Sequence, residues 1–249
     1  MNRPTRILFS SLSILIVIAG LSIQSACPRA HAAKFTDNDF QAQRLAMVES
    51  QIMERGIKDR SVIEAMMAVP RHKFVSENYL NRAYDDSPLP IGYGQTISQP
   101  YIVAYMTEIL NLNKNRRVLE VGTGSGYQAA ILSPIVKQVY TIEIIPELAK
   151  SAATRLKDLG YHNVEVAIGD GYFGWNKYAP FDAIIVTAAA GHIPPPLIEQ
   201  LKNNGRMVIP MGGSFLIQNL ILVTKDKDGN VTTRNLIPVR FVPLTDRHN

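Results

Sequence analysis

The stretch "RRVLEVGTGSGYQAA", Arg116 to Ala130, decides the fold of this chain. A short strand-like run, Val118 to Val121, leads into three closely spaced glycines, and an apolar helical pattern begins at about Tyr127. Glycine allows a strand to turn tightly into a helix and lets the backbone come close to a ligand. The stretch therefore predicts a strand, a glycine turn and a helix, which together form the repeating unit of a doubly wound α/β sheet.

The chain after Arg116 continues this alternation of strands and helices. Helices are expected from Pro146, a residue suited to the first helical position, and over residues 194–202. The alternation predicts a doubly wound, mostly parallel sheet. Further strands are expected over residues 138–144, 163–171, 181–190 and 205–212. In the tail, two strand-like runs flank Asp228-Gly229, which predicts a hairpin and hence an antiparallel C-terminal edge.

Residues 37–110 predict N-terminal helices that pack on this sheet. Apolar residues recur with helical spacing over residues 37–56, and Gly56 is a suitable C-terminal stop. Asp59 is a suitable N-cap for a second helix, which Pro70 would end.

The uncharged stretch "GYGQTISQP", Gly92 to Pro100, predicts a loop, and a helix is expected from there to about Leu110. Its glycines and proline favour irregular backbone, and its polar side chains carry no charge. Such a loop either covers a surface or holds a ligand.

The composition indicates one domain of ordinary globular character. The chain has 249 residues, of which 46% are hydrophobic and 19% charged. The formal net charge is +5, but Arg3, Arg6 and Arg29 lie in the first 32 residues, which contain no Asp or Glu. The basic excess is therefore largely a property of the N-terminus, and a nucleic-acid partner is not expected.

The first 32 residues predict a cleaved signal peptide. The basic "MNRPTR" precedes an apolar run, and "AHA" at Ala30 to Ala32 has the small-x-small form of a cleavage site. Residues 33–249 would then be a mature, periplasmic, single-domain chain without a stable membrane partner. Two alternatives remain: an uncleaved membrane anchor, and a cytoplasmic protein whose start is wrongly assigned. Cys27 is the only cysteine, so the mature chain would have no disulfide and no thiolate metal site. The five histidines are scattered, and no metal is expected.

The glycine spacing favours one class of cofactor. A dinucleotide turn has the spacing G-x-G-x-x-G, but Tyr127 stands where its third glycine should be. The observed G-x-G-x-G spacing is the form seen in S-adenosylmethionine-dependent methyltransferases. The candidate cofactor-binding residues in this turn are Gly122, Thr123, Gly124 and Gly126.

Two acidic positions strengthen this interpretation. Glu143 ends the second expected strand and could accept hydrogen bonds from ribose hydroxyls, while Asp170-Gly171 ends the third and could accept from an adenine amino group. Ligands of doubly wound sheets bind where strands end in this way. The alternatives are a carboxylate at a helix N-terminus for Glu143 and a plain turn for Asp170-Gly171.

The methyl acceptor is best explained as a carboxylate. Amino-methyltransferases of nucleic-acid bases commonly carry Asn/Asp-Pro-Pro-aromatic after the fourth strand, where this chain has Thr187 and alanines. A carboxylate needs no deprotonation before it accepts a methyl group.

The chain resembles the protein-L-isoaspartate (D-aspartate) O-methyltransferase family over roughly residues 40–246. The segment around Gly92 to Pro100 is the most family-specific part of the resemblance. The matching motifs are "VPRHKFV" (69–75), "LPIGYGQTISQPYIVAYMTE" (89–108), "VLEVGTGSGYQAAIL" (118–132), "GDG" (169–171), "PFDAIIVTAAA" (180–190) and "VRFVPLTD" (239–246).

The resemblance implies roles for particular residues. Ser98 matches the active-site serine, and the polar segment would lie over the methyl donor and hold the substrate. The implied substrate-binding residues are Gln95, Thr96, Ile97 and Thr245, and the implied cofactor-binding residues are Gly122, Thr123, Gly124, Gly126, Glu143, Asp170 and Gly171. An alternative role for Ser98 is an N-cap on the following helix. His72 is not expected to be a catalytic base.

The resemblance further implies methyl esterification of isoaspartyl residues in damaged peptides and proteins, by a monomeric enzyme that uses S-adenosylmethionine and no metal. The ester would close to a succinimide that hydrolyses partly to normal aspartate. Two other functions stay open: a methyltransferase for a small-molecule carboxylate, and an exported binding protein without turnover. The predicted signal peptide departs from the usual cytosolic setting of the family.

Overall fold

The computed structural model describes Met1, residues 35–213 and residues 217–245. The predicted signal peptide lies outside the described residues. Within them, no helix has the length and apolar character needed to cross a membrane. The described residues from Phe35 onward form one compact unit.

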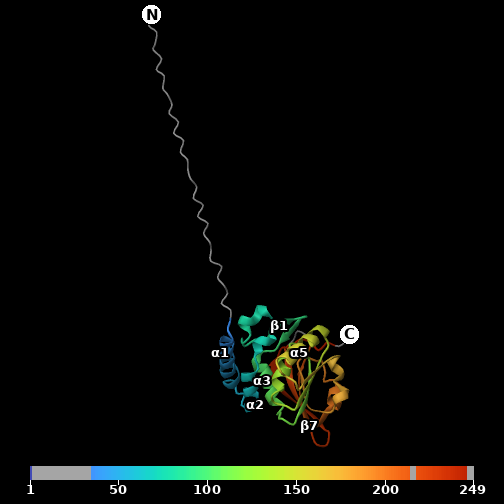
Figure 1. Ribbon diagram of the computed structural model, residues 1–249. Helices are drawn as coiled ribbons and strands as arrows, with labels where there is room; N and C mark the ends of the chain where they lie inside the picture. The colour runs from blue at the N-terminus through green and yellow to red at the C-terminus, as the bar shows by residue number, and fades with distance from the viewer. Residues whose placement is uncertain (2–34, 214–216, 246–249) are drawn as a thin grey trace. The chain divides into compact units, whose positions relative to one another are not determined.

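A seven-stranded sheet forms the centre of this unit (Figure 1). Its strand order is β5-β4-β3-β6-β7-β8-β9, in which neighbours from β5 to β7 run parallel and β8 and β9 are antiparallel additions. The strands are β3 (Arg117–Val121), β4 (Gln138–Glu143), β5 (Val164–Ile168), β6 (Phe181–Val186), β7 (Leu201–Met211), β8 (Gln218–Lys225) and β9 (Val231–Val239). The predicted mostly parallel sheet with an antiparallel C-terminal edge is confirmed.

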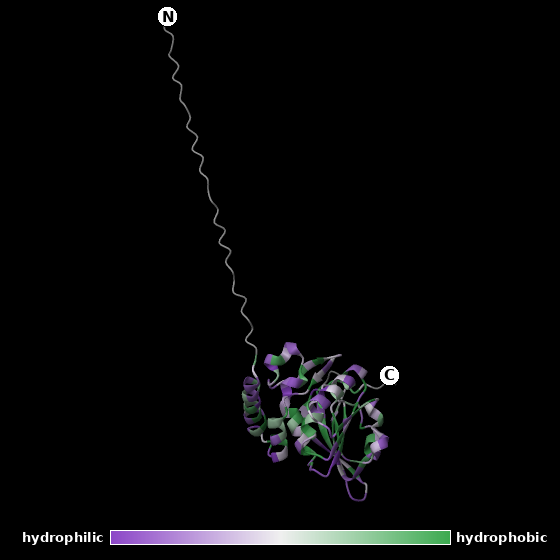
Figure 2. Ribbon diagram, in the orientation of Figure 1, coloured by the Kyte–Doolittle hydropathy of each residue, from purple (hydrophilic) through white to green (hydrophobic). Residues whose placement is uncertain are grey.

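Both faces of the sheet are covered, and hydrophobic residues therefore concentrate on its central strands (Figure 2). Successive residues enter opposite cores: Val118 packs in the cluster beneath the N-terminal helices, and Leu119 packs in the cluster on the other face. Strand β6 is almost wholly buried, as expected for a parallel strand covered on both sides. The connecting helices are α4 (Tyr127–Leu132), α5 (Pro146–Asp158) and α6 (Pro195–Glu199).

The predicted N-terminal helices are present, with one difference. Helix α1 (Asp37–Met47) begins at a capping box between Thr36 and Asp39, and it continues as a π-helix, η1 (Val48–Met53). The wider π turn keeps Val48 and Ile52 buried. Asp59 caps α2 (Arg60–Ala68) as predicted, by accepting from two backbone N–H groups. Residues 71–82 contain two 3-10 helices, η2 (Arg71–Phe74) and η3 (Glu77–Arg82).

The segment expected to be a loop is in fact half of a β-hairpin. Strands β1 (Leu89–Gly92) and β2 (Gln95–Ile97) pair antiparallel, and helix α3 (Pro100–Ile109) follows. Tyr93 and Gly94 form the two-residue connection with φ of 54° and 72°, and two successive positive φ angles are typical of a type I′ turn. The loop prediction was wrong here because Tyr-Gly is not the usual turn pair and the strands are very short.

The predicted C-terminal hairpin is confirmed. Gly229 has a φ of 88° in the turn between β8 and β9. The Asp226 carboxylate accepts from the backbone N–H groups of Asp228 and Asn230, which closes the turn.

Candidate active site

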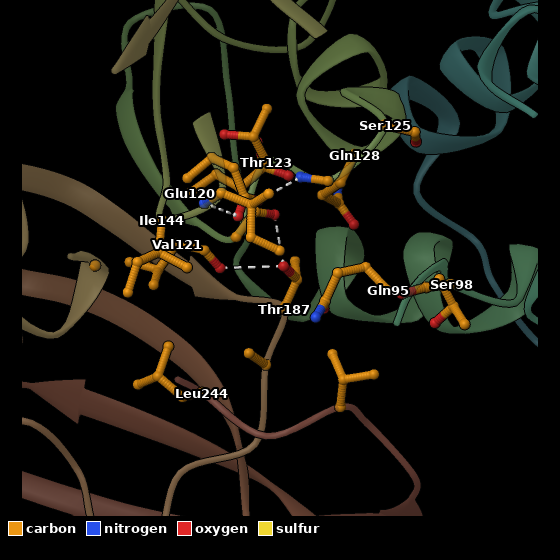
Figure 3. A pocket seen from close by; sticks show the side chains of 18 of the residues that line it. Gln95, Ser98, Glu120, Val121, Thr123, Ser125, Gln128, Ile144, Thr187 and Leu244 are labelled. Carbon is orange, nitrogen blue, oxygen red and sulfur yellow. Dashed lines mark hydrogen bonds between the residues drawn. The ribbon is translucent and has the colours of Figure 1, made fainter. Parts of the chain in front are cut away.

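A cleft lies at the carboxyl ends of β3, β4 and β6 (Figure 3). Three parts of the chain that are distant in sequence form its walls: the glycine turn, residues 95–98 of the hairpin, and residues 242–245 after β9. Of the residues that the sequence suggested, Gln95, Thr96, Ile97, Ser98, Gly122, Thr123, Gly124, Glu143, Gly171 and Thr245 line this cleft, whereas Gly126 and Asp170 do not.

The glycine turn is fixed by contacts that leave no room for side chains. Gly122 has a φ of 96°, and a Cβ there would lie 2.4 Å from the Thr187 hydroxyl oxygen. Gly124 has a φ of 53°, and its N–H donates to Glu143 Oε2 at 2.9 Å. Gly126 is instead the left-handed N-cap of α4 and packs against Leu156. Its role is therefore to let the turn enter the helix.

Glu143 joins the turn to the end of β4. Its side chain is buried, with Oε1 accepting from the Ile145 N–H at 3.0 Å and Oε2 accepting from Gly124. Ile145 is the N-cap of α5, so the carboxylate lies just before the helix, as the alternative interpretation held. Each carboxylate oxygen can accept a second hydrogen bond, so Glu143 retains capacity for ligand hydroxyls.

Asp170 lies beside the cleft with one oxygen unused. Oδ1 accepts from the Tyr172 N–H at 2.9 Å and so caps the short helix η4 (Gly171–Phe173). Oδ2 is buried and has no hydrogen-bond partner within the described residues. A buried acceptor without a donor destabilises the folded chain. Asp170 Oδ2 is therefore available to accept a hydrogen bond from an N–H group of a ligand. Gly171 lines the cleft, where a Cβ would lie 2.4 Å from Val121 Cγ1.

Glu120 is a cleft residue that the sequence reasoning missed. It is fully buried in β3, and neither carboxylate oxygen has a hydrogen-bond partner within the described residues. Burial raises its pKa to about 8, and the nearby Glu143 carboxylate adds to that rise. An acidic residue inside the apolar run "VLEV" was the available signal, because a buried carboxylate without a partner is rare in a structural strand.

The Ser98 side chain is half-buried, and its hydroxyl is available to bind a ligand. Its hydroxyl makes no hydrogen bond within the described residues, and the N-cap of α3 is Gln99. The capping role considered for Ser98 is therefore wrong: Pro100 begins the helix, so the cap lies one residue later. Figure 3 shows Gln95 and Ser98 on the segment that faces Thr187.

A second cleft adjoins the first. Its walls include Pro88, Gln99, Ile102, Phe241 and Arg240, and it shares Thr96, Ser98, Thr187 and Val242 with the first cleft. Ser98 therefore stands where the two clefts meet. Among the described lining residues of both clefts, Arg240 is the only cation, and it lines the second cleft alone.

The C-terminal segment closes the cleft opposite the hairpin. The Ala189 N–H donates to Val242 O at 2.8 Å, and the Leu244 N–H donates to Ala189 O at 2.7 Å. These bonds hold residues 242–245 beside the end of β6, which brings the exposed Thr245 to the cleft.

His72 lies away from both clefts. Its ring stacks on Phe40 at 4.1 Å, and Nδ1 is 2.8 Å from the Tyr84 hydroxyl oxygen. Burial lowers its pKa to about 4, and nearby Lys73 and Arg44 add to that effect. The expectation that His72 is not a catalytic base agrees with this position.

The residues present fit S-adenosylmethionine. The glycine turn would pass under the methionine and ribose, Glu143 would accept from the ribose hydroxyls, and the free Asp170 oxygen would accept from the adenine amino group. No group of three or more His, Cys, Asp or Glu side chains with metal-site geometry occurs in the described part of the chain. The fold and the site thus define an S-adenosylmethionine-dependent methyltransferase.

Comparison with known proteins specifies the family. The family model described as Protein-L-isoaspartate(D-aspartate) O-methyltransferase (PCMT) matches residues 42–249. The protein-L-isoaspartate O-methyltransferase 2 of Syntrophobacter fumaroxidans is 51% identical, covering 100% of both chains. The protein-L-isoaspartate O-methyltransferase 1 of Nitrosospira multiformis is 57% identical over 84% of this chain and 90% of its own. The chain belongs to the protein-L-isoaspartate O-methyltransferase family.

Solved structures agree with this assignment. A protein-L-isoaspartate O-methyltransferase superposes with a TM-score of 0.74 and 29% identity, over 82% of this chain and 66% of its own. A β-aspartate methyltransferase from Plasmodium falciparum, solved in complex with S-adenosyl-L-homocysteine, has a TM-score of 0.70 and 27% identity, over 81% of this chain and 98% of its own.

Proposed function

We propose that this protein methylates the free carboxylate of L-isoaspartyl residues, and of D-aspartyl residues, in damaged peptides and proteins. The ester then closes to a succinimide, which starts repair. Family membership supports the reaction. The observation that carries the assignment to this site is the position of Ser98, in the wall that the two adjoining clefts share. The first cleft suits the methyl donor, and the second suits a peptide.

Methyl transfer to a carboxylate depends on alignment more than on proton transfer, and orientation alone can contribute about 7–11 kcal/mol. The S-adenosylmethionine sulfonium supplies the methyl group. Ser98 would donate a hydrogen bond from its hydroxyl to the carboxylate oxygen that does not attack, and so fix the direction of the carboxylate. Thr96 and Thr187 would form the remaining neutral walls.

The neutral character of the junction supports this mechanism. A cation beside the attacking oxygen would reduce its nucleophilicity and repel a positively charged donor. Arg240 lines only the second cleft, so among the residues that the structure describes, those shared by both clefts include no cationic side chain.

We also propose that the chain is exported, that residues 1–32 are removed, and that it acts as a monomer without a metal or a nucleic-acid partner. The basic and apolar pattern before "AHA" supports export. Mass spectrometry of the N-terminus in fractionated cells tests it. We expect a chain beginning at Ala33 in the periplasm; an uncleaved chain in the cytoplasm would refute export, and one in the membrane would indicate an anchor.

The reaction is tested with two peptides that differ only in having isoaspartate or aspartate at one position. The purified chain from Ala33 and labelled S-adenosylmethionine should give base-labile label on the isoaspartyl peptide alone. Label on free carboxylic acids instead would favour the small-molecule alternative. Donor binding without transfer to any acceptor would favour the non-catalytic alternative.

A further inference from the structure

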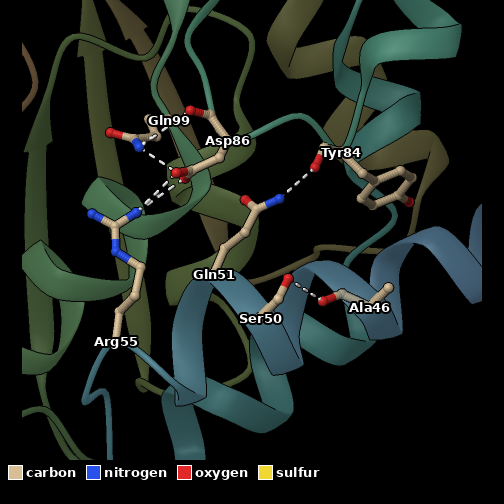
Figure 4. A network of polar contacts seen from close by, with 7 residues as sticks. All are labelled: Ala46, Ser50, Gln51, Arg55, Tyr84, Asp86 and Gln99. Atoms are coloured by element: carbon tan, nitrogen blue, oxygen red, sulfur yellow. Dashed lines mark hydrogen bonds and ion pairs between the residues drawn. The ribbon is translucent and has the colours of Figure 1, made fainter.

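Asp86 connects the N-terminal helices to the segment that carries Ser98 (Figure 4). Arg55 Nη1 donates to both carboxylate oxygens of Asp86, at 3.2 and 3.0 Å. Gln99 Nε2 donates to Asp86 Oδ1 at 2.8 Å and to the Asp86 backbone oxygen at 3.3 Å. One carboxylate therefore holds a cation on one side and the residue next to Ser98 on the other.

The contact between Asp86 and Gln99 closes the base of the β1–β2 hairpin. The first pair of the hairpin is Leu89 with Ile97, and Asp86 and Gln99 lie just outside that pair on the two strands' extensions. Gln99 is the N-cap of α3, but its side chain makes no cap hydrogen bond and binds Asp86 instead. Ser98 lies between the Leu89–Ile97 pair and this contact.

The other partner of Asp86 is also held in place. The Arg55 guanidinium lies 3.6 Å from the centre of the Tyr101 ring, on the first turn of α3. Gln51 Nε2 donates to Tyr84 O at 2.8 Å, which ties the chain just before Asp86 to the π-helix. The first turn of α3 and the chain just before Asp86 are thus both held against the N-terminal helices, although Asp86 itself lines neither cleft.

We propose that Asp86 is a positioning residue for Ser98. Through Arg55 and Gln99 it sets the direction in which the Ser98 hydroxyl faces the acceptor at the junction of the two clefts. This inference rests on the proposed function of Ser98.

Stability and activity should respond differently to loss of Asp86. The Arg55 and Asp86 side chains are 39% and 43% exposed, and ion pairs this exposed contribute little to folding. Displacement of a catalytic group by about 1 Å can nevertheless reduce a rate about 100-fold. If Asp86 had only a structural role, its loss would lower the free energy of unfolding more than it lowered kcat.

The test compares Asp86→Ala with Asp85→Ala, a matched control. Asp85 is the preceding residue and pairs with Arg82. The Asp85 side chain is 46% exposed and the Arg82 side chain 50%, and neither residue lines either cleft. In Asp86→Ala we expect kcat on an isoaspartyl peptide to fall about 10- to 100-fold. The Kd for S-adenosylhomocysteine should stay within about twofold, and the melting temperature should match that of Asp85→Ala, because the contact is half-exposed.

Two further variants test the route through Gln99. Asp86→Asn keeps an acceptor for Gln99 and should lose less activity than Asp86→Ala. The double variant Asp86→Ala/Gln99→Ala should have a kcat no lower than that of the more affected single variant, because the two substitutions remove the same contact. Additive losses would refute the connection through Gln99.

Amide hydrogen exchange provides a measurement that does not depend on the reaction. Exchange in residues 95–99 should be faster in Asp86→Ala than in the wild-type chain, and unchanged in Asp85→Ala. Unchanged exchange or full kcat in Asp86→Ala would overturn the inference, as would a loss of kcat matched by losses in donor affinity and melting temperature. A wild-type chain that ignores isoaspartyl peptides would overturn the proposed function instead, and the exchange comparison would still decide whether Asp86 fixes the segment.

Discussion

The Thr187 hydroxyl donates to the backbone oxygen of Gly122 at 2.7 Å, and so ties the end of β6 to the first glycine of the turn. The same hydroxyl lies 3.1 Å from Val121 O, which is also an acceptor within its reach. Thr187 occupies the position where base-modifying methyltransferases commonly carry their polar catalytic motif. In this protein that position supports the cofactor turn and forms part of the wall between the two clefts.

Gly122→Ala should abolish donor binding and destabilise the fold. Its Cβ would lie 2.4 Å from Thr187 Oγ1, at a φ of 96° that alanine rarely adopts. The matched control is Gly56→Ala, with a φ of 93° and no atom within 4 Å of its Cβ. We expect Gly56→Ala to lower the free energy of unfolding by about 1–2 kcal/mol, because alanine is disfavoured at a positive φ. Urea unfolding measures this change. Equal losses in the two variants would show that the contact with Thr187 is unimportant.

Ser98→Ala should lose activity without losing stability. The hydroxyl caps no helix and makes no hydrogen bond within the described residues, so the free energy of unfolding should change by less than about 0.5 kcal/mol. A lost hydrogen bond to a charged acceptor should lower kcat/KM by about 10- to 100-fold.

The control for Ser98 is Thr36→Ala, which removes a real capping box at α1. This variant should lose about 1 kcal/mol of stability and keep its kcat. A Ser98→Ala chain that is destabilised as much as Thr36→Ala would contradict the assignment.

Glu120→Gln should raise the melting temperature at alkaline pH. The pKa of Glu120 is raised in the folded chain from 4.5 to about 8, so the folded chain binds this proton more tightly than the unfolded chain. The contribution of Glu120 is fully present below pH 4.5 and is lost as the pH rises toward 8. We therefore expect the variant's advantage over wild type to grow across this range, measured without donor. Glu77→Gln, on the exposed helix η3, serves as control, and an advantage that does not change with pH would argue against a protonated Glu120.

Asp170→Asn should weaken binding of S-adenosylhomocysteine about 10- to 100-fold, because a charged acceptor is replaced by a donor. The amide oxygen can still accept from the Tyr172 N–H, so the fold should be retained. Asp59→Asn is a suitable control, since asparagine caps helices as well as aspartate does and Asp59 lines neither cleft. Calorimetric titration measures the affinity of both variants for S-adenosylhomocysteine. Unchanged affinity in Asp170→Asn would exclude Asp170 Oδ2 from the donor site.

The fold and most cleft residues could be predicted because they depend on local pattern. The glycine turn, the alternation of strands and helices, the cap at Asp59 and the hairpin at Gly229 are each specified by neighbours in the sequence. Glu143 and Gly171 follow because parallel strands end at one edge of a sheet, which brings their last residues together.

Other parts of the site could not be read in this way. The acidic residue in the apolar run around Glu120 was a signal, but only the structure shows that its carboxylate is buried without a hydrogen-bond partner among the described residues. Gly126 resembles the other two glycines of the turn, and its different role follows only from its position against Leu156. The hairpin was missed because its strands are too short to show alternation. Ser98 looked like a helix cap, because which residue caps α3 depends on the backbone angles at Gln99.

By itself, the sequence determined the class of sheet, the glycine turn and the family, because these depend on residue types at fixed short spacings. Only the tertiary structure decided that Ser98 stands between two clefts, that Asp86 holds the segment around it, and that Arg240 lies on one side alone. Such relationships join residues far apart in the chain, and their distances are set by the packing of the helices and the hairpin against the sheet.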